Sequence, residues 1–386
     1  MIKIAVFLVI NIFILGCDSG LDSFNSGQAD DSGDSDELIV TYFVPDNRKI
    51  PNLCKTDTDC VNDDMCTLAA CFENQCIYTQ KPPQLKLTTL SLVSDAVDAA
   101  LFSEYIYVAK GSDGIDIINI KDSNTPRFIG TAKTSGEAVA VDAMENRFIV
   151  GEIDWGIEAF ANNNLTKVQA SFSNGNGALR HIDSVVNVDI NGDLLMVSGY
   201  EEGLAILKSN LTRPAMLATV ETPGRVVSAV SSKPGFAFTA DSLGGMAVIN
   251  FKDKKIVKGA TLTTKGRVVD VDAKKDTGII AGYGDGFTVL DLSDPLKPQR
   301  LFTVKRVVRV VAAKLLGSQT AIVAYENGLI SIYDFRHITK PVNIISADTG
   351  FTISAHHMDI YNGSGVVTLD NGEVVLFETH CAGKQF

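Results

Sequence analysis

The seven cysteines of this 386-residue chain are the residues whose spacing most directly implies chemistry. Five of them fall within residues 54–76, separated by five, five, four and four residues: Cys54, Cys60, Cys66, Cys71 and Cys76. A segment this short cannot bury a core large enough to hold it together, so disulfide bonds are expected to stabilise it. A zinc site is the alternative, but the segment has no C-x2-C pair and no nearby histidine.

Cys17 stands in different surroundings. The first sixteen residues, MIKIAVFLVINIFILG, carry one early charge and then an apolar run, which is typical of a signal peptide. Residues 14–17, ILGC, resemble the lipobox of bacterial lipoproteins, which implies cleavage before Cys17 and a diacylglycerol on its sulfur. An ordinary secretory signal followed by a chance cysteine is the alternative. Two or three acyl chains anchor a protein stably, so we expect a lipid-anchored protein of the bacterial cell envelope, at the outer membrane or cell surface.

Cys381 completes the count. Lipidation of Cys17 would leave six cysteines, five of them in residues 54–76 and the sixth near the C-terminus. Five cysteines cannot all pair with one another, so Cys381 is expected to bond to one of them. The sequence does not choose between the possible connectivities.

Arginines and aromatic residues form a second candidate group, suited to recognition. Three arginines stand in the closely related local sequences GRVV, GRVV and KRVV: Arg225, Arg267 and Arg306. Four aromatic residues stand at or beside short turns: Trp155, Tyr200, Tyr283 and Tyr325. Gathered on one surface, these residues would bind a protein or glycan partner through ring stacking and charged hydrogen bonds. The alternative is that the arginines pair with turn carboxylates and the tyrosines pack inside the fold.

Motifs for catalysis are absent from the sequence, which contains no G-x-S-x-G, H-E-x-x-H or P-loop pattern. Residues 189–193, DINGD, resemble part of a calcium loop, but an Asn-Gly pair between two apolar runs is more simply a hairpin turn. His181, His356 and His357 have no carboxylate fixed beside them by sequence. We therefore assign no catalytic residue, no metal and no cofactor.

A repeat positions these candidates, and it is clearest in residues 265–304. Four strands are expected there, RVVDVDA, GIIAGY, FTVLDLS and QRLFTV, because β-branched and aromatic residues dominate them. The Gly-Asp-Gly between the second and third strands predicts a tight turn, since glycine accepts positive φ.

The last glycine of that turn can be followed through the chain at intervals of 41 to 47 residues: Gly114, Gly156, Gly203, Gly245, Gly286, Gly328 and Gly372. Four-stranded units at this period are typical of propeller blades. The sequence therefore predicts an all-β, seven-bladed propeller, preceded by the small disulfide-rich module. Unrelated hairpins with glycine turns are the alternative, which the regular spacing disfavours.

The segments VAKGSDGIDIINIKDSNTPRFIG and AGYGDGFTVLDLSDPLKP resemble the LVIVD-repeat family of bacterial and archaeal surface propellers. The resemblance covers about residues 84–380 and implies a cell-surface propeller with no particular reaction. Residues 54–76 resemble short cysteine-rich modules of secreted bacterial proteins. The second and fourth repeats lack the proline loop before their outer strand, so that strand is less certain in them.

The two ends of the propeller should meet. The seventh repeat offers three strands, so residues 84–92 are expected to pair with GEVVLFET and close the ring, which removes an exposed edge. If the first strand of each repeat is innermost, the three arginines approach the mouth of the central channel, on the face that carries the glycine turns. That mouth is the predicted binding surface.

The domains follow from these boundaries: a signal peptide (1–16), the lipidated cysteine with an acidic tether (17–37), a short strand with the cysteine-rich module (38–83) and the propeller (84–386). The tether carries seven acidic residues and no basic one, and the chain has a net charge of −12. No basic stripe is present, so nucleic acid is not expected as a partner. A non-catalytic binding or scaffold propeller is the preferred function; a channel-mouth enzyme of hydrolase or lyase type and a structural surface-layer component are the alternatives.

Overall fold

The computed structural model divides the chain into two compact units, Met1–Ile39 and Val40–Phe386. The residues that the structure describes belong to the second unit and run from 54 to 381, except 57–58, 61–66, 73, 81–82, 92–94, 146, 154, 163–167, 174–183, 200–202, 209–214, 223, 258–260, 265, 285 and 337–340. The expected signal peptide, Cys17, the acidic tether, Cys66 and Tyr200 lie outside the described residues.

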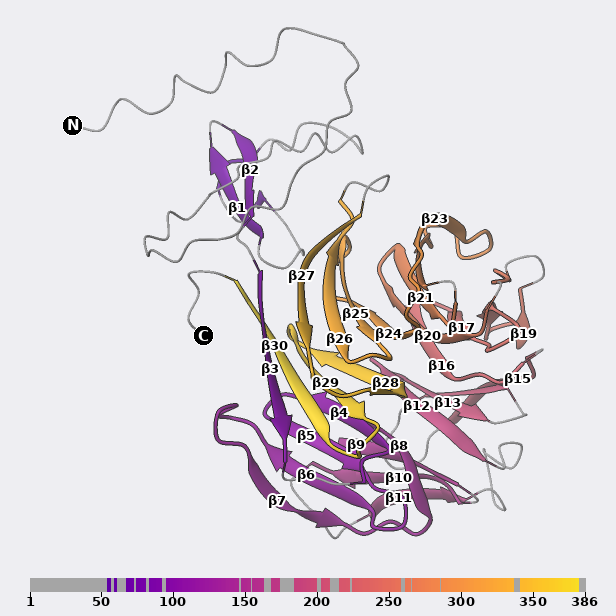
Figure 1. The fold of residues 1–386 in the computed structure, drawn as a ribbon. Helices are drawn as coiled ribbons and strands as arrows, with labels where there is room; N and C mark the ends of the chain where they lie inside the picture. The colour runs from indigo at the N-terminus through magenta and orange to yellow at the C-terminus, as the bar shows by residue number, and fades with distance from the viewer. Residues whose placement is uncertain are drawn as a thin grey trace, which may run out of the picture. The chain divides into compact units, whose positions relative to one another are not determined.

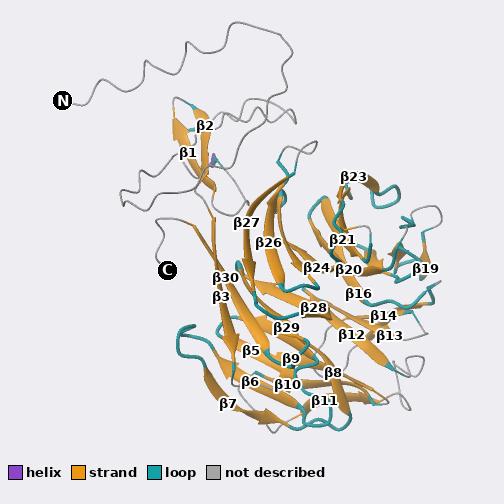
Figure 2. Cartoon of the chain, viewed as in Figure 1, coloured by secondary structure: helices purple, strands orange, loops and turns teal. Residues whose placement is uncertain are grey.

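The described residues form seven four-stranded antiparallel sheets and one two-stranded sheet (Figures 1 and 2). None of them belongs to a helix long and apolar enough to cross a membrane.

Each four-stranded sheet is one propeller blade. Blades 1 and 2 contain β4 (Asp98–Phe102), β5 (Tyr105–Ala109), β6 (Ile115–Asn119), β7 (Arg127–Ala132), then β8 (Glu137–Met144), β9 (Arg147–Ile153), β10 (Gly156–Ala161) and β11 (Val168–Ser173). Blades 3 and 4 contain β12 (Val185–Asn191), β13 (Leu194–Gly199), β14 (Leu204–Lys208), β15 (Ala215–Val220), then β16 (Ser228–Lys233), β17 (Phe236–Ala240), β18 (Met246–Asn250) and β19 (Lys255–Ile256). Blades 5 and 6 contain β20 (Val268–Lys274), β21 (Thr277–Gly282), β22 (Gly286–Asp291), β23 (Gln299–Val304), then β24 (Val310–Leu315), β25 (Thr320–Tyr325), β26 (Leu329–Asp334) and β27 (Val342–Asp348). Blade 7 contains β28 (Ile353–Tyr361), β29 (Ser364–Leu369), β30 (Val374–Cys381) and β3 (Pro83–Leu90).

The strands of the repeat lie within one or two residues of their expected positions. Blade 4 differs most, because its outer strand β19 has only two residues. That blade lacks the proline loop, which fits the weaker expectation for its outer strand.

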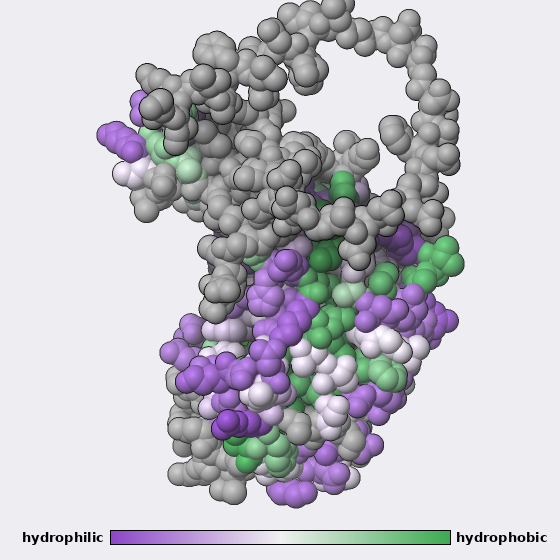
Figure 3. Space-filling view, turned by 60° about the vertical axis from the view of Figure 1, so that its left-hand side comes forward, coloured by the Kyte–Doolittle hydropathy of each residue, from purple (hydrophilic) through white to green (hydrophobic). Residues whose placement is uncertain are grey.

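The first strand of every blade lies innermost, and we call these seven the inner strands: β4, β8, β12, β16, β20, β24 and β28. Each inner strand contacts the next, and β28 contacts β4, so the ring is complete. Seven apolar clusters fill the spaces between consecutive blades. Between blades 1 and 2, for example, the ring of Phe148 stacks on Tyr107 and on Phe160, with centroids 4.6 and 5.0 Å apart. Apolar residues also reach the surface among hydrophilic ones (Figure 3).

The expected closure of the ring is confirmed. β3 pairs antiparallel with β30 along its whole length, from Pro83 opposite Cys381 to Leu90 opposite Val374. The Lys86 ammonium group lies 3.1 Å from the Glu378 carboxylate across this pair of strands. The seam therefore carries a full strand ladder, and the last blade has no missing strand.

All seven glycines that marked the repeat have positive φ, between 78° and 119°. At Gly286 a second reason for glycine appears, because a Cβ there would lie 2.0 Å from the carbonyl oxygen of Val304. The turn thus needs both a left-handed backbone and close approach of the outer strand.

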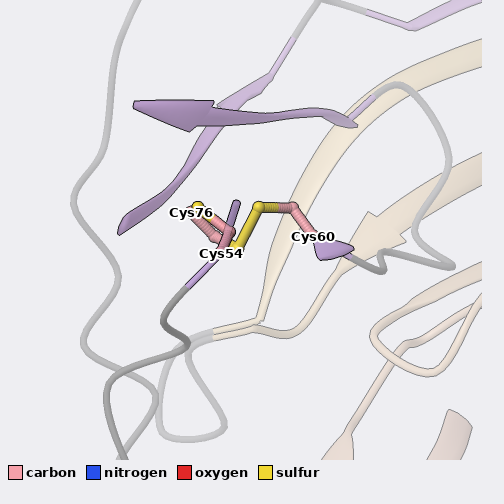
Figure 4. A group of neighbouring side chains, drawn as sticks. All are labelled: Cys54, Cys60 and Cys76. Carbon is pink, nitrogen blue, oxygen red and sulfur yellow. A yellow bond between two sulfur atoms is a disulfide. The ribbon is translucent and has the colours of Figure 1, made fainter. Parts of the chain in front are cut away.

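The cysteine-rich module contains the two-stranded sheet of β1 (Thr67–Phe72) and β2 (Gln75–Gln80). Its described residues hold two disulfides, Cys54–Cys71 and Cys60–Cys76. Cys71 and Cys76 are direct partners across the two strands, so one disulfide leaves each strand. The sulfur atoms of Cys54, Cys60 and Cys76 lie within 4.8 Å of one another (Figure 4). These sulfurs are bonded in disulfides, which removes the thiolates that a zinc ion would need.

Candidate functional site

A cavity of about 450 Å³ lies in the central channel and is lined by residues from all seven blades. Its lining comes mainly from the ends of the inner strands and from the turns that follow them, at Glu145 and at Asn191–Gly192. Charged groups from five blades line it: Asp142, Glu145, Asp189, Asp272, Lys314 and Asp359. We call this space the channel cavity.

Hydrogen bonds to the open edge of each inner strand hold the channel carboxylates in place. An inner strand has a ladder partner on one side only, so some of its backbone N–H groups face the channel without a strand partner. Aspartates of the preceding blade accept hydrogen bonds from these groups. The donors and distances are Leu101 N to Asp359 Oδ2 (2.8 Å), Val141 N to Asp98 Oδ2 (2.8 Å), Ile190 N to Asp142 Oδ2 (2.5 Å), Ala229 N to Asp189 Oδ2 (3.2 Å) and Leu315 N to Asp272 Oδ2 (2.7 Å).

Several of these carboxylates also accept the N–H of the residue that follows them, as Asp142 does from Ala143 at 2.7 Å and Asp359 from Ile360 at 2.8 Å. Each aspartate is therefore held by its own strand and by the next blade. The arrangement holds the carboxyl groups as a ring with a defined geometry.

Lys314 is the one basic residue in the described lining of the channel cavity. Its ammonium group lies 2.9 Å from Asp270 Oδ1, and both side chains are nearly buried. Burial acts to lower the pKa of Lys314, but the carboxylates of Asp270, Asp272 and Asp189 outweigh it and raise that pKa. Lys314 is therefore a fixed cation.

One cation does not balance the carboxylates around it. Burial raises the pKa of Asp98 to about 8, that of Asp189 to about 7 and that of Asp359 to about 6. The pKa of Asp142 lies well above its usual range because of burial and of the neighbouring Asp359 carboxylate. The channel cavity thus has an unmet demand for positive charge, which increases as the pH rises.

Apolar side chains line the same space as these charges. They include Phe102, Met144, Ile190, Ile360 and Tyr361. The rings of Phe102 and Tyr361 lie 4.6 Å apart at a tilt of 52°. A cation with an apolar stem would find carboxylates for its charge and aromatic or aliphatic groups for its stem.

The expected binding residues lie at the other end of the inner strands. Arg225 and Arg267 come just before β16 and β20. Trp155 and Tyr283 belong to turns between second and third strands, and Tyr325 is the last residue of the second strand β25. We call this end of the ring the entry face, because each inner strand begins there. The channel cavity opens among the turns that follow the inner strands, so it is not at the mouth where the arginines lie.

The three arginines are not equivalent. Tyr283 N donates to Arg267 O at 2.8 Å in blade 5, and the matching bond in blade 6 runs from Glu326 N to Arg309 O at 3.0 Å. The segment KRVVRVV contains the repeated pattern twice, and the backbone uses its second copy. Arg309 therefore occupies the position expected for Arg306.

Arg306 and Tyr325 both form hydrogen bonds with the buried hydroxyl group of Tyr333. The Arg306 guanidinium donates to Tyr333 Oη and lies 5.7 Å from the centre of that ring. Tyr333 Oη lies 2.8 Å from Tyr325 Oη, and Tyr325 is only 2% exposed. In this structure Tyr325 packs inside the fold and its ring is not available for stacking on a ligand.

Two of the expected aromatic residues do reach the entry face. Tyr283 is half-buried, and the Arg309 guanidinium lies 5.4 Å from the centre of its ring. Trp155 is 38% exposed. These two therefore keep a surface on which a partner could pack.

The candidate binding residues chosen from the sequence did not include the channel aspartates. A signal for them exists at the ends of four inner strands, in VDAM, VDIN, VDAK and MDIY: Asp142, Asp189, Asp272 and Asp359. Alternation along each strand accounts for one aspartate at a time. The repetition at the same place in four blades is what marks them as a group.

No protein-family model matches the chain, and no curated protein matches it. Solved structures do share its architecture. The RRP9 WD40 repeats superpose with a TM-score of 0.62 at 10% identity, covering 78% of this chain and 99% of that one. The WD40 β-propeller domain of Doa1 gives a TM-score of 0.60 at 13% identity, covering 77% and 97%. Identities this low establish the propeller fold alone.

Proposed function

We propose that this chain is a non-catalytic binding propeller that holds a protein partner by receiving one of the partner's basic side chains in the channel cavity. The observation that carries this proposal is the charge of the cavity, where five lining carboxylates, four of them from aspartates of the inner strands, face a single ammonium group. A ligand that supplies positive charge there gains buried electrostatic interactions that water cannot screen.

A lysine or arginine side chain fits both parts of the lining. Its charged head matches Asp142 and Asp359, while its methylene stem can pack against Met144 and Tyr361. The cavity volume of about 450 Å³ is within the usual range of ligand pockets. A glycan, the other expected partner, carries no positive charge to meet this demand.

The hydrogen bonds of the aspartates favour binding over catalysis. Each of the four lining aspartates accepts a backbone N–H of the next blade, so its position is tied to the ring itself. Such groups are suited to act as fixed charges. A general acid or base also needs a free path for its proton to a substrate.

The test uses a fluorescently labelled peptide with one central lysine, and a matched peptide with norleucine in its place. Titration into the protein should show binding of the lysine peptide at pH 8 and weaker binding at pH 5.5, where Asp189 and Asp359 become protonated. The double variant D142N/D359N should bind the lysine peptide at least about tenfold more weakly, a loss of about 1.4 kcal/mol or more.

Asp193→Asn is the matched control, because Asp193 is exposed and does not line the cavity. It should bind within about twofold of the parent protein, which is the scale of ordinary surface changes. Equal binding of the lysine and norleucine peptides, or equal binding by D142N/D359N, would contradict the proposal.

The location is part of the same proposal and rests on sequence. The ILGC at residues 14–17 and the LVIVD-like motifs support a lipid-anchored propeller on the bacterial cell envelope, with Cys17 as the lipidated residue. In a bacterial host, the parent protein should partition into the detergent phase and incorporate a labelled fatty acid. Cys17→Ser should do neither; incorporation by this variant would rule out Cys17 as the anchor.

A further inference from the structure

The entry face carries a second feature, which is separate from the channel cavity. Five exposed cationic residues lie on the loops that lead into blades 4, 5 and 6: Arg225, Arg267, Lys305, Arg306 and Arg309. Three acidic residues in the described part of these loops, the adjoining turns and the neighbouring end of β27 are not buried, Glu221, Glu326 and Asp348. We call this region the basic sector.

The rest of the entry face has the opposite character. On blades 7, 1 and 2 its exposed acidic residues are Asp95, Asp113, Glu137 and Asp370. Two lysines lie in the same described region: Lys110 forms an ion pair with Asp116 at 3.1 Å, and the exposed Lys133 donates to Asp113 O at 3.1 Å. The entry face is therefore divided into a basic and an acidic side, although the chain as a whole is acidic.

Large apolar side chains project beside the cations of the basic sector. Val307 is fully exposed, Leu243 is 75% exposed and Phe351 is 49% exposed. Val308 is also on the surface. Leaving these groups in water has a free-energy cost that a bound partner could remove.

Backbone contacts join these residues into one surface. Val268 N donates to Ser242 O at 3.0 Å, which places the Leu243 turn beside the loop of Arg267. Arg309 lies over the Tyr283 ring and forms an ion pair with Glu326 at 2.9 Å. Ile353 N donates to Glu326 O at 3.1 Å, which brings the loop of Phe351 alongside. The basic sector and its apolar groups thus extend without a break from blade 4 to blade 7.

We propose that the basic sector docks an acidic protein segment that carries large apolar side chains. The cations supply charge complementarity, and Leu243, Val307 and Phe351 supply contacts for the apolar groups between the acidic ones. A nucleic acid would use the cations but leave Val307 and Phe351 without a matching group. An anionic membrane would match both the cations and the apolar side chains, so the test below includes it as a competing ligand. The proposal concerns a different face from the channel cavity and does not depend on the function proposed above.

Binding can be measured with the folded protein and a labelled acidic peptide of alternating glutamate and leucine. We expect saturable binding that weakens with added salt. Charge reversal in R267E/K305E should weaken binding at least about tenfold, since opposite-charge steering and contact are both lost. The double variant V307S/V308S should also weaken it, with little effect on the fold because both residues are on the surface.

K121E/K297E is the matched control, because both lysines are exposed and lie on loops between third and fourth strands, away from the entry face. It makes the same change in net charge and should bind the acidic peptide as the parent does. D142N/D359N should also leave acidic-peptide binding unchanged, which keeps the two proposals distinguishable.

Three results would overturn the proposal. The first is an equal loss of binding in R267E/K305E and K121E/K297E, which would show a nonspecific charge effect. Binding to anionic phospholipid vesicles or duplex DNA in preference to the peptide would identify another class of ligand. Self-association of the parent that R267E/K305E abolishes would identify a second copy of the chain as the occupant.

Discussion

Lys314→Met removes the cation at the centre of the channel and tests how far that residue stabilises the ring. Methionine keeps a similar length and apolar volume, so the change is chiefly the loss of charge. Lys314 and Asp270 have side chains only 12% and 5% exposed, and their charged atoms are 2.9 Å apart. Removing one partner of such a pair leaves the other charge buried without its counter-ion.

The expected loss lies at the lower end of the range for a broken buried ion pair, about 3 kcal/mol. Asp270 keeps other donors, namely Ser228 Oγ at 3.0 Å, Val271 N at 2.9 Å and Ala313 N at 3.1 Å. Asp189 and Asp272 lose the same cation. Their carboxyls can take up protons at low pH, so the loss should be smaller at pH 5 than at pH 8.

Urea unfolding followed by far-UV circular dichroism, with the disulfides intact, gives the change in unfolding free energy. In a double-mutant cycle, D270N should cost less in the K314M background than in the parent protein, with a coupling of about 2 kcal/mol. A loss below about 1 kcal/mol for K314M at pH 7.5, or strictly additive effects, would refute the view of Lys314 as the counter-charge of the ring.

Three further predictions concern other parts of the chain. Glu152 is buried beside Glu158, and burial, followed by the Glu158 charge, raises the pKa of Glu152 to about 8. The contribution of Glu152 to stability is therefore full below pH 4.5 and declines as the pH rises to about 8. E152Q should reduce the fall in melting temperature between about pH 5 and pH 8, and an unchanged fall would contradict this. Deletion of residues 83–90 removes β3 with the buried Leu90 and should lower stability by more than about 3 kcal/mol, so melting at the parental temperature would show that β3 does not close the ring. Cys381 is disulfide-bonded, and the pairs Cys54–Cys71 and Cys60–Cys76 leave Cys66 as the remaining cysteine of the module. A proteolytic digest without reduction should therefore yield two peptides joined through Cys66 and Cys381. A free thiol at either residue would exclude that bond.

The sequence by itself determined the architecture of the propeller. The spacing of the turn glycines fixed the number of blades because each such turn needs a left-handed backbone, which few other residues adopt readily. Alternating apolar residues fixed the strands. The shortage of one strand at the C-terminal end led to a closing strand expected at residues 84–92, which the structure has at 83–90. These features are local or periodic, so they can be read along the chain.

The site depended on tertiary structure. The repeated RVV in KRVVRVV offered two registers, and only the hydrogen bond between Glu326 and Arg309 selects the second. Tyr325 had the same local surroundings as an exposed turn residue, but packing against Tyr333 buries it. Register and burial of this kind are set by neighbouring strands and blades, which the local sequence does not specify.

The channel cavity shows the same limit most clearly. Alternation predicts that Asp142 or Asp359 faces the channel, but its partner is a backbone N–H of the next blade, more than 40 residues away in the chain. Whether the space between seven inner strands is filled or hollow depends on the summed volumes of side chains from every blade. Lys314 becomes the counter-charge of the channel carboxylates only when the ring closes, because only then do charges from five blades share one poorly screened space.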